Sequence, residues 1–113
     1  MRNSMRRDRV LREAWLGDAV LCLYARQRIL RDSGGIDAAK CSRMTSNQFL
    51  GALGEASEVE AELGRVYAAD GLEAAFHWIE AQLMPLFERQ ENKRERAAGR
   101  PIRSSPRGSP GAA

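Results

Sequence analysis

The chain has 113 residues, a net charge of +3, 43% hydrophobic and 29% charged residues, which fits one folded domain and excludes a fully disordered chain. No apolar run approaches the ~20 residues that span a bilayer, and the charged start is unlike a signal peptide, so we expect a cytoplasmic protein without a membrane segment. Two cysteines without a CxxC pair and a single histidine argue against a zinc cluster.

The first apolar repeat predicts one long helix from about Asp8 to Arg31. Its apolar residues at helical spacing are Leu11, Trp15, Ala19, Leu23 and Leu30. Gly17 lies inside this helix, where it costs about 1 kcal/mol relative to alanine. We therefore expect another backbone or a ligand to approach closely there. Cys22 is expected to act as a small buried hydrophobe, and the DSGG segment at 32–35 ends the helix.

Asp37 predicts the start of a second helical stretch that runs to about Leu53. Thr45 and Ser46 are weak helix formers and are expected to interrupt it. A third helix is predicted to begin at Ser57, because the segment Ser57-x-x-Glu60 has the form of a capping box.

A fourth helix is predicted over residues 72–90, with Pro85 bending or ending it early. The segment 91–113 is rich in Arg, Ser, Gly and Pro and is expected to be a basic, disordered tail. Residues 1–90 are thus predicted to form one all-α domain of about four to five helices.

Charge is segregated along the chain. Residues 1–12 carry +4, residues 13–90 carry −5 and residues 91–113 carry +4. Basic ends on an acidic body suit a polyanion such as RNA, because Lys and Arg gain affinity by releasing counterions from phosphates. Solubilising tails are the alternative explanation of the same pattern.

Two segments resemble the ribonuclease III family. Residues 13–24, EAWLGDAVLCLY, are similar to its signature helix, in which an aromatic residue precedes Leu-Gly-Asp, a small residue and an apolar run. Residues 56–71, ASEVEAELGRVYAADG, are similar to its second acidic segment. The resemblance covers about residues 10–88, is closest to the short subfamily Mini-ribonuclease III, and implies a shortened ribonuclease III-like helical domain.

The resemblance implies magnesium-dependent cleavage of double-stranded or structured RNA, of the kind that processes ribosomal RNA precursors. Asp18 matches the signature aspartate and Glu60 matches the second-segment glutamate, so both are implied as catalytic residues and Mg²⁺ ligands. Their carboxylates must then converge. Asp18 could instead be a helix-surface carboxylate, and the capping box alone would explain Glu60.

Two further acids of the family are missing. Ala14 and Ser57 stand at positions where the family usually carries acidic residues. This departure leaves open a second interpretation, a catalytically inactive ribonuclease III-like protein that binds RNA or the ribosome as a structural module.

The resemblance also implies partners. Trp15 matches an aromatic residue that packs across a two-fold interface, so we expect a homodimer, with a tryptophan buried in its own protomer as the alternative. RNA phosphates are expected to meet the cationic residues Arg26, Arg28, Lys93, Arg94 and Arg96. Arg26 and Arg28 could equally favour the negative end of the first helix.

Overall fold

The computed structural model describes residues 2–99, with side chains from residue 4 onward, and within this range it contains helices and no strand. The helices are α1 (Arg2–Ser33), α2 (Ala38–Thr45), α3 (Asn47–Gly51), α4 (Ala56–Asp70), α5 (Leu72–Gln82) and α6 (Met84–Ala97). The predicted all-α class is confirmed, with six helices over the described residues. None of these helices is both long and apolar enough to cross a bilayer.

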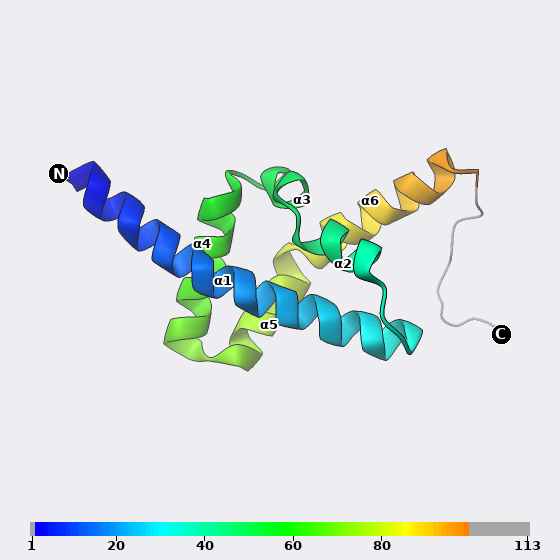
Figure 1. Cartoon of the computed structure of the whole chain (residues 1–113), viewed down its shortest axis with the longest axis horizontal. Helices are drawn as coiled ribbons and strands as arrows, with labels where there is room; N and C mark the ends of the chain where they lie inside the picture. Colours follow the sequence, from blue (N-terminus) through cyan, green and yellow to red (C-terminus); the bar gives the residue numbers. More distant parts are fainter. Residues whose placement is uncertain (1, 100–113) are drawn as a thin grey trace.

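Helix α1 runs along most of the molecule (Figure 1), and α2, α4 and α5 pack against it. Helix α3 packs on α2 and α4, and α6 packs on α5. It has 32 residues, six more at its start than expected, because nothing between Arg2 and Asp8 breaks a helix. It ends where predicted. Gly34 adopts φ +76° and its amide donates to the carbonyl of Leu30 at 2.9 Å, a conformation that glycine adopts without strain.

Helix α4 crosses α1 near the middle of α1 (Figure 1), and two glycines make the close approach possible. A Cβ on Gly17 would lie 1.9 Å from the carbonyl oxygen of Glu60, and one on Gly64 would lie 2.0 Å from that of Glu13. The close backbone approach predicted at Gly17 is therefore confirmed. Beside the crossing, a small apolar cluster joins the two helices: Val10, Ala14 and Ala61.

The main core fills the space between the inner face of α1 and the other five helices. Tyr24 packs edge-on against Phe76 with ring centroids 5.2 Å apart, and Phe49 packs edge-on against Phe87 at 5.5 Å. The fully buried large side chains of this core are Leu21, Met44, Leu50, Leu63, Ile79 and Leu83. This core fixes α1 relative to α4 and so positions the residues at their crossing.

Two interruptions between helices follow the sequence prediction. Ser46 separates α2 from α3 and caps α3, with its hydroxyl accepting from the amide of Phe49 at 3.0 Å. Leu83 separates α5 from α6, and Pro85 lies in the first turn of α6, where a missing amide hydrogen is tolerated. Pro85 therefore does end the preceding helix early.

The disordered tail predicted from residue 91 is wrong for residues 91–97, which continue α6. Glu, Lys and Arg favour helices, and Glu91 accepts two hydrogen bonds from the guanidinium of Arg43 on α2, at 2.8 and 2.9 Å. A contact with a distant segment thus stabilises a stretch that has almost no apolar residues. The rest of the predicted tail, residues 100–113, lies outside the described residues.

Candidate active site

The two acids singled out by the sequence lie together at the crossing of α1 and α4. Asp18 is exposed on α1, directly after Gly17, and Glu60 is half-buried on α4. Because the backbone of Glu60 packs on the bare Cα of Gly17, its carboxyl group comes within hydrogen-bonding reach of Asp18. The convergence that metal-assisted chemistry requires is therefore present in a single protomer.

The pair is electrostatically unfavourable when both acids are ionised. Burial, a hydrogen bond to Asp18 and the negative charges of Asp18 and Glu55 raise the pKa of Glu60 to about 7. Within residues 4–99, neither Asp18 nor Glu60 forms an ion pair with Lys, Arg or His. Two neighbouring carboxylates without a cation are the arrangement expected where a cation binds.

The capping box predicted at Ser57 is wrong. Glu55 is the N-cap of α4, and its carboxylate accepts from the amides of Ser57 at 3.2 Å and Glu58 at 3.1 Å. Ser57 lies inside the first turn, so Glu60 does not reach back to cap it. The structural explanation that competed for Glu60 is thereby removed.

The positions of the two missing family acids differ in character. Ala14 is 6% exposed and packs in the small cluster with Val10 and Ala61, so an acid there would be buried against apolar groups. Ser57 is half-buried in the first turn of α4. Among the described residues, no third His, Cys, Asp or Glu joins Asp18 and Glu60 in a group that could hold a metal ion.

The two carboxylates nevertheless fit a magnesium ion. Mg²⁺ prefers oxygen ligands in octahedral geometry and is commonly held by one or two carboxylates, with water and substrate phosphate completing the shell. The carboxylates of Asp18 and Glu60 meet that requirement, and Asp18 leaves the site open to solvent. A cation there would relieve the repulsion that raises the pKa of Glu60.

Cys22 is a neighbour of this site that the sequence analysis treated as a buried hydrophobe. It is half-buried, and burial together with the nearby Asp18, Cys41 and Glu60 raises the pKa of its thiol. It lies four residues after Asp18, and residues at that spacing share one face of a helix. That spacing was the signal in the sequence that could have placed Cys22 beside the acids.

Trp15 is 79% exposed, so the alternative of a tryptophan buried in its own protomer is wrong. Leu11 and Leu16 beside it on α1 are also exposed. Three large apolar side chains in solvent on one stretch of helix are unusual and are typical of an interaction surface.

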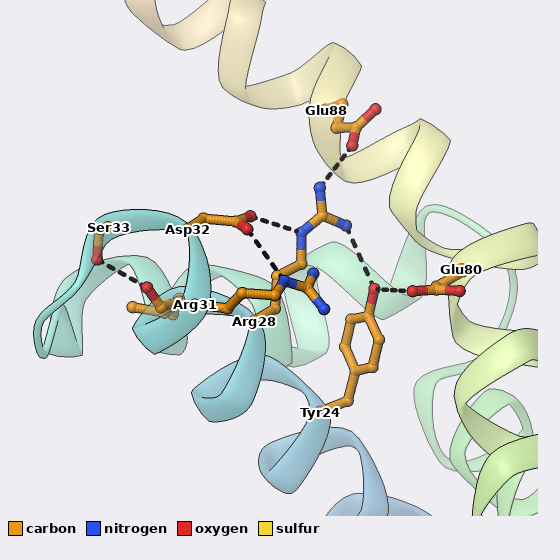
Figure 2. A network of polar contacts seen from close by, with 8 residues as sticks. Tyr24, Arg28, Arg31, Asp32, Ser33, Glu80 and Glu88 are labelled. Atoms are coloured by element: carbon orange, nitrogen blue, oxygen red, sulfur yellow. Dashed lines mark hydrogen bonds and ion pairs between the residues drawn. The ribbon is translucent and has the colours of Figure 1, made fainter. Parts of the chain in front are cut away.

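Arg28, one of the five cations expected to bind RNA, is held by a polar network between α1, α5 and α6 (Figure 2). Its guanidinium donates to Glu88 at 2.7 Å, to Asp32 at 3.3 Å and to the hydroxyl of Tyr24, which in turn donates to Glu80. Burial alone would lower the pKa of Arg28, but the hydrogen bonds to Glu88 and Tyr24 outweigh it and raise the pKa above its ordinary value. A phosphate could reach Arg28 only by displacing these carboxylates.

The other four cations are available. Arg26 on α1 and Lys93, Arg94 and Arg96 on α6 are exposed, and none forms an ion pair within residues 4–99. Arg26 lies two helical turns after Asp18, on about the same face of α1. The three cations of α6 lie on the part of that helix that points away from the rest of the molecule (Figure 1).

No protein-family model, no curated protein and no solved structure matches this chain. The resemblance to ribonuclease III therefore stays a prediction, carried by the residues around Asp18 and Glu60. The arrangement itself consists of two converging carboxylates, open to solvent and without a cation among the described residues.

Proposed function

We propose that this chain is a magnesium-dependent endoribonuclease that cleaves double-stranded or structured RNA, of the kind that processes ribosomal RNA precursors in the cytoplasm. The observation that carries the proposal is the convergence of Asp18 and Glu60 without a neighbouring cation. By contrast, Glu13, which also lies on α1 at this crossing, is paired with Arg65 of α4 at 2.8 Å. An acid that is paired with a cation stabilises a fold. Two acids that face each other without a cation lower the stability, and such an arrangement is typical of sites with a chemical use.

In this proposal Asp18 and Glu60 hold the metal through their carboxylate oxygens. A bound magnesium ion supplies Lewis-acid stabilisation of the charge that develops on the scissile phosphate. Glu60 must lose its proton before it can act as a ligand. Because the metal and the proton compete for Glu60, the affinity for magnesium should increase as the pH rises toward about 7, the pKa that burial and Asp18 give to Glu60 without metal.

The exposed cations bind the RNA backbone. Arg26 lies on α1 near the acids, and Lys93, Arg94 and Arg96 extend the positive surface along α6. Contacts of this kind fix the position of a duplex without reading its sequence. The paired part of a duplex would then be recognised through its A-form shape and its phosphates.

The proposal includes a homodimer that uses the exposed apolar side chains of α1. Leu11, Trp15 and Leu16 would be covered by the same residues of a second copy, as a two-fold interface requires. A dimer would place two acid pairs on one particle, so that both strands of a duplex could be cut.

The test is cleavage of a structured RNA in Mg²⁺ by the wild type, Asp18→Asn and Glu60→Gln. The matched control is Glu62→Gln, which removes an exposed carboxylate from the same helix. We expect the wild type and the control to cut, and the two site variants to lose at least about 100-fold in rate. Circular dichroism of each variant verifies that it is folded.

RNA binding by the wild type without any cutting would refute the nuclease and support the alternative of a structural RNA- or ribosome-binding protein. The buried Ala14 favours that alternative, because it leaves the site with two carboxylates and no third ligand. Failure to bind RNA at low salt, where phosphate contacts are strongest, would contradict both functions.

A further inference from the structure

A pocket of about 490 Å³ opens between α1 and α2. Its residues come from the second half of α1, from the connection at 36–37 and from α2. The apolar part of its lining is Ile29, Leu30, Ile36 and Ala38. Two cysteines, Cys22 and Cys41, also line it.

Cys22 connects this pocket to the acids. Its side chain lines the pocket, and it is close enough to Asp18 and Glu60 for their charges to raise the pKa of its thiol. Asp18, Cys22 and Arg26 follow one another at intervals of four residues, so they lie in a row along α1. At 1.5 Å per residue, Arg26 is roughly 12 Å from Asp18 along the helix axis.

The polar groups of the pocket suit a ligand in which an anionic group is attached to an apolar part that also carries hydrogen-bonding atoms. Arg26 is exposed at the pocket and has no ion pair within residues 4–99. Ser42 and Thr45 line the pocket from α2. The hydroxyl of Thr45 donates to the carbonyl of Cys41 at 2.9 Å, so it can only accept from a ligand. Asp37 is the one acid of the lining, and its carboxylate already accepts from the amide of Lys40 at 2.9 Å as the cap of α2.

We propose that this pocket binds one unpaired nucleobase of the RNA substrate, while Arg26 neutralises the adjoining phosphate. The proposal rests on the proposed function and narrows it: the preferred substrate is a duplex with a bulged or looped nucleotide close to the cleaved bond. The apolar walls bury the faces of the base. The hydroxyl of Ser42 donates to or accepts from its polar edge, and the hydroxyl of Thr45, which already donates to the carbonyl of Cys41, accepts from it.

The nucleotide that enters the pocket must be unpaired, because base pairing would hold its base inside the duplex. The bases of an A-form duplex are stacked and paired inside it, and a protein reaches a whole base only where the strand is bulged, looped or ended. The pocket lies beside the acids instead of around them. A duplex can therefore place its scissile phosphate at Asp18 while a base one or two nucleotides along the strand enters the pocket.

The test compares two hairpin RNAs of equal length, one fully paired and one with a single bulged 2-aminopurine. Binding is measured without divalent metal, so that no cutting occurs, by anisotropy and by the fluorescence of the bulged base. We expect the wild type to bind the bulged RNA roughly tenfold more tightly and to change its fluorescence.

Two variants should abolish this preference: Ala38→Trp, which fills the pocket, and Arg26→Gln, which removes its cation. Ala39→Trp and Arg31→Gln are the matched controls, because both residues are exposed on the same helices and neither lines the pocket. We expect both controls to keep the preference. If Ala38→Trp does not fold, the exposed Arg26→Gln decides alone.

Equal affinity of the wild type for the two RNAs would overturn the proposal, as would an unchanged preference in Arg26→Gln. If an apolar dye binds the wild type but not Ala38→Trp while both RNAs bind equally, the pocket belongs to an apolar ligand instead. If the wild type prefers the bulged RNA but does not cut it in Mg²⁺, the base-binding pocket is supported and the nuclease is refuted. If it cuts both RNAs at the same rate and binds them equally, the nuclease is supported and the base-binding pocket is refuted.

Discussion

Two regions of α1 handle buried or half-buried charge in opposite ways. At the crossing with α4, two carboxylates face each other, and the pKa of Glu60 rises to about 7 through burial and the proximity of Asp18. Near the C-terminal end of the same helix, Arg28 lies among Asp32, Glu88 and the hydroxyl of Tyr24. At the crossing two negative charges lie side by side, whereas around Arg28 a positive charge lies beside negative ones.

This difference separates a structural network from a candidate site. The network around Arg28 joins α1 to α6, and its ion pairs and hydrogen bonds are accounted for by their contribution to the stability of the fold (Figure 2). The pair at the crossing gains nothing from its arrangement unless a cation joins it. Removing the charge of Glu60 at the crossing should therefore stabilise the fold, whereas removing the charge of Arg28 from the network should destabilise it.

The largest effect on stability is expected for Gly17→Ala, which places a Cβ against the carbonyl oxygen of Glu60. We expect it to lower the free energy of unfolding by about 3 kcal/mol, because the two backbones must move apart. The acid pair should separate with them. Gly51→Ala is the control, since a Cβ there meets nothing within 4 Å. Equal stability of the two variants in urea denaturation would contradict the close crossing.

A smaller loss is expected for Arg28→Met, which keeps the length of the side chain but leaves Asp32, Glu88 and Tyr24 without their donor. We expect about 2 kcal/mol of destabilisation, the usual range for hydrogen bonds to charged groups. Arg31→Met is the control, because its side chain is 65% exposed and its ion pair contributes little. If both variants lost the same small amount, the network would be a surface feature without structural weight.

The smallest effect, and the one with the opposite sign, is expected for Glu60→Gln. The folded state raises the pKa of Glu60 above its ordinary 4.5, so ionisation of Glu60 destabilises the fold as the pH rises from about 4.5 to 7. At pH 8 the variant should be more stable than the wild type by about 1 to 2 kcal/mol, after allowing for solvent screening. The gain should largely disappear at pH 5.

The measurement is urea denaturation at both pH values without divalent metal, with Glu62→Gln as the control of unchanged stability. Mg²⁺ should then stabilise the wild type at pH 8 and leave Glu60→Gln unaffected. A Glu60→Gln variant that is less stable than the wild type at pH 8 would show that the acid pair does not repel.

Local patterns predicted the parts of the fold that depend on neighbouring residues. The apolar repeats predicted the helices. Ser46 and Pro85 indicated where the helices are interrupted, and Gly17 indicated a close backbone contact. The convergence of Asp18 and Glu60 was expected from the family resemblance alone. No spacing within the sequence relates two helices so far apart.

Contacts between distant segments decided the features that the sequence analysis missed. Ser57 is of the residue type that most often caps a helix, yet α4 begins at Ala56 and Glu55 caps it instead. The helical structure of residues 91–97 involves Arg43, almost fifty residues earlier. For Trp15, the family resemblance favoured a dimer interface, and its exposure in the protomer removes the alternative of a buried tryptophan. Apolar periodicity alone placed Trp15 in a helix without indicating which face would remain uncovered.

The continuity of α1 has a consequence for any strand that lies along it. Asp18, Cys22 and Arg26 belong to one unbroken helix, so their mutual spacing does not depend on a loop or a hinge. Asp18 and Arg26 lie about 80° apart around the helix axis, and inserting one residue between them would turn them about 180° apart. Inserting seven would bring them back to about 60° apart, at a separation greater by roughly 10 Å. The distance between the bond that is cut and the nucleotide that is recognised would thus be set by the number of helical residues between Asp18 and Arg26.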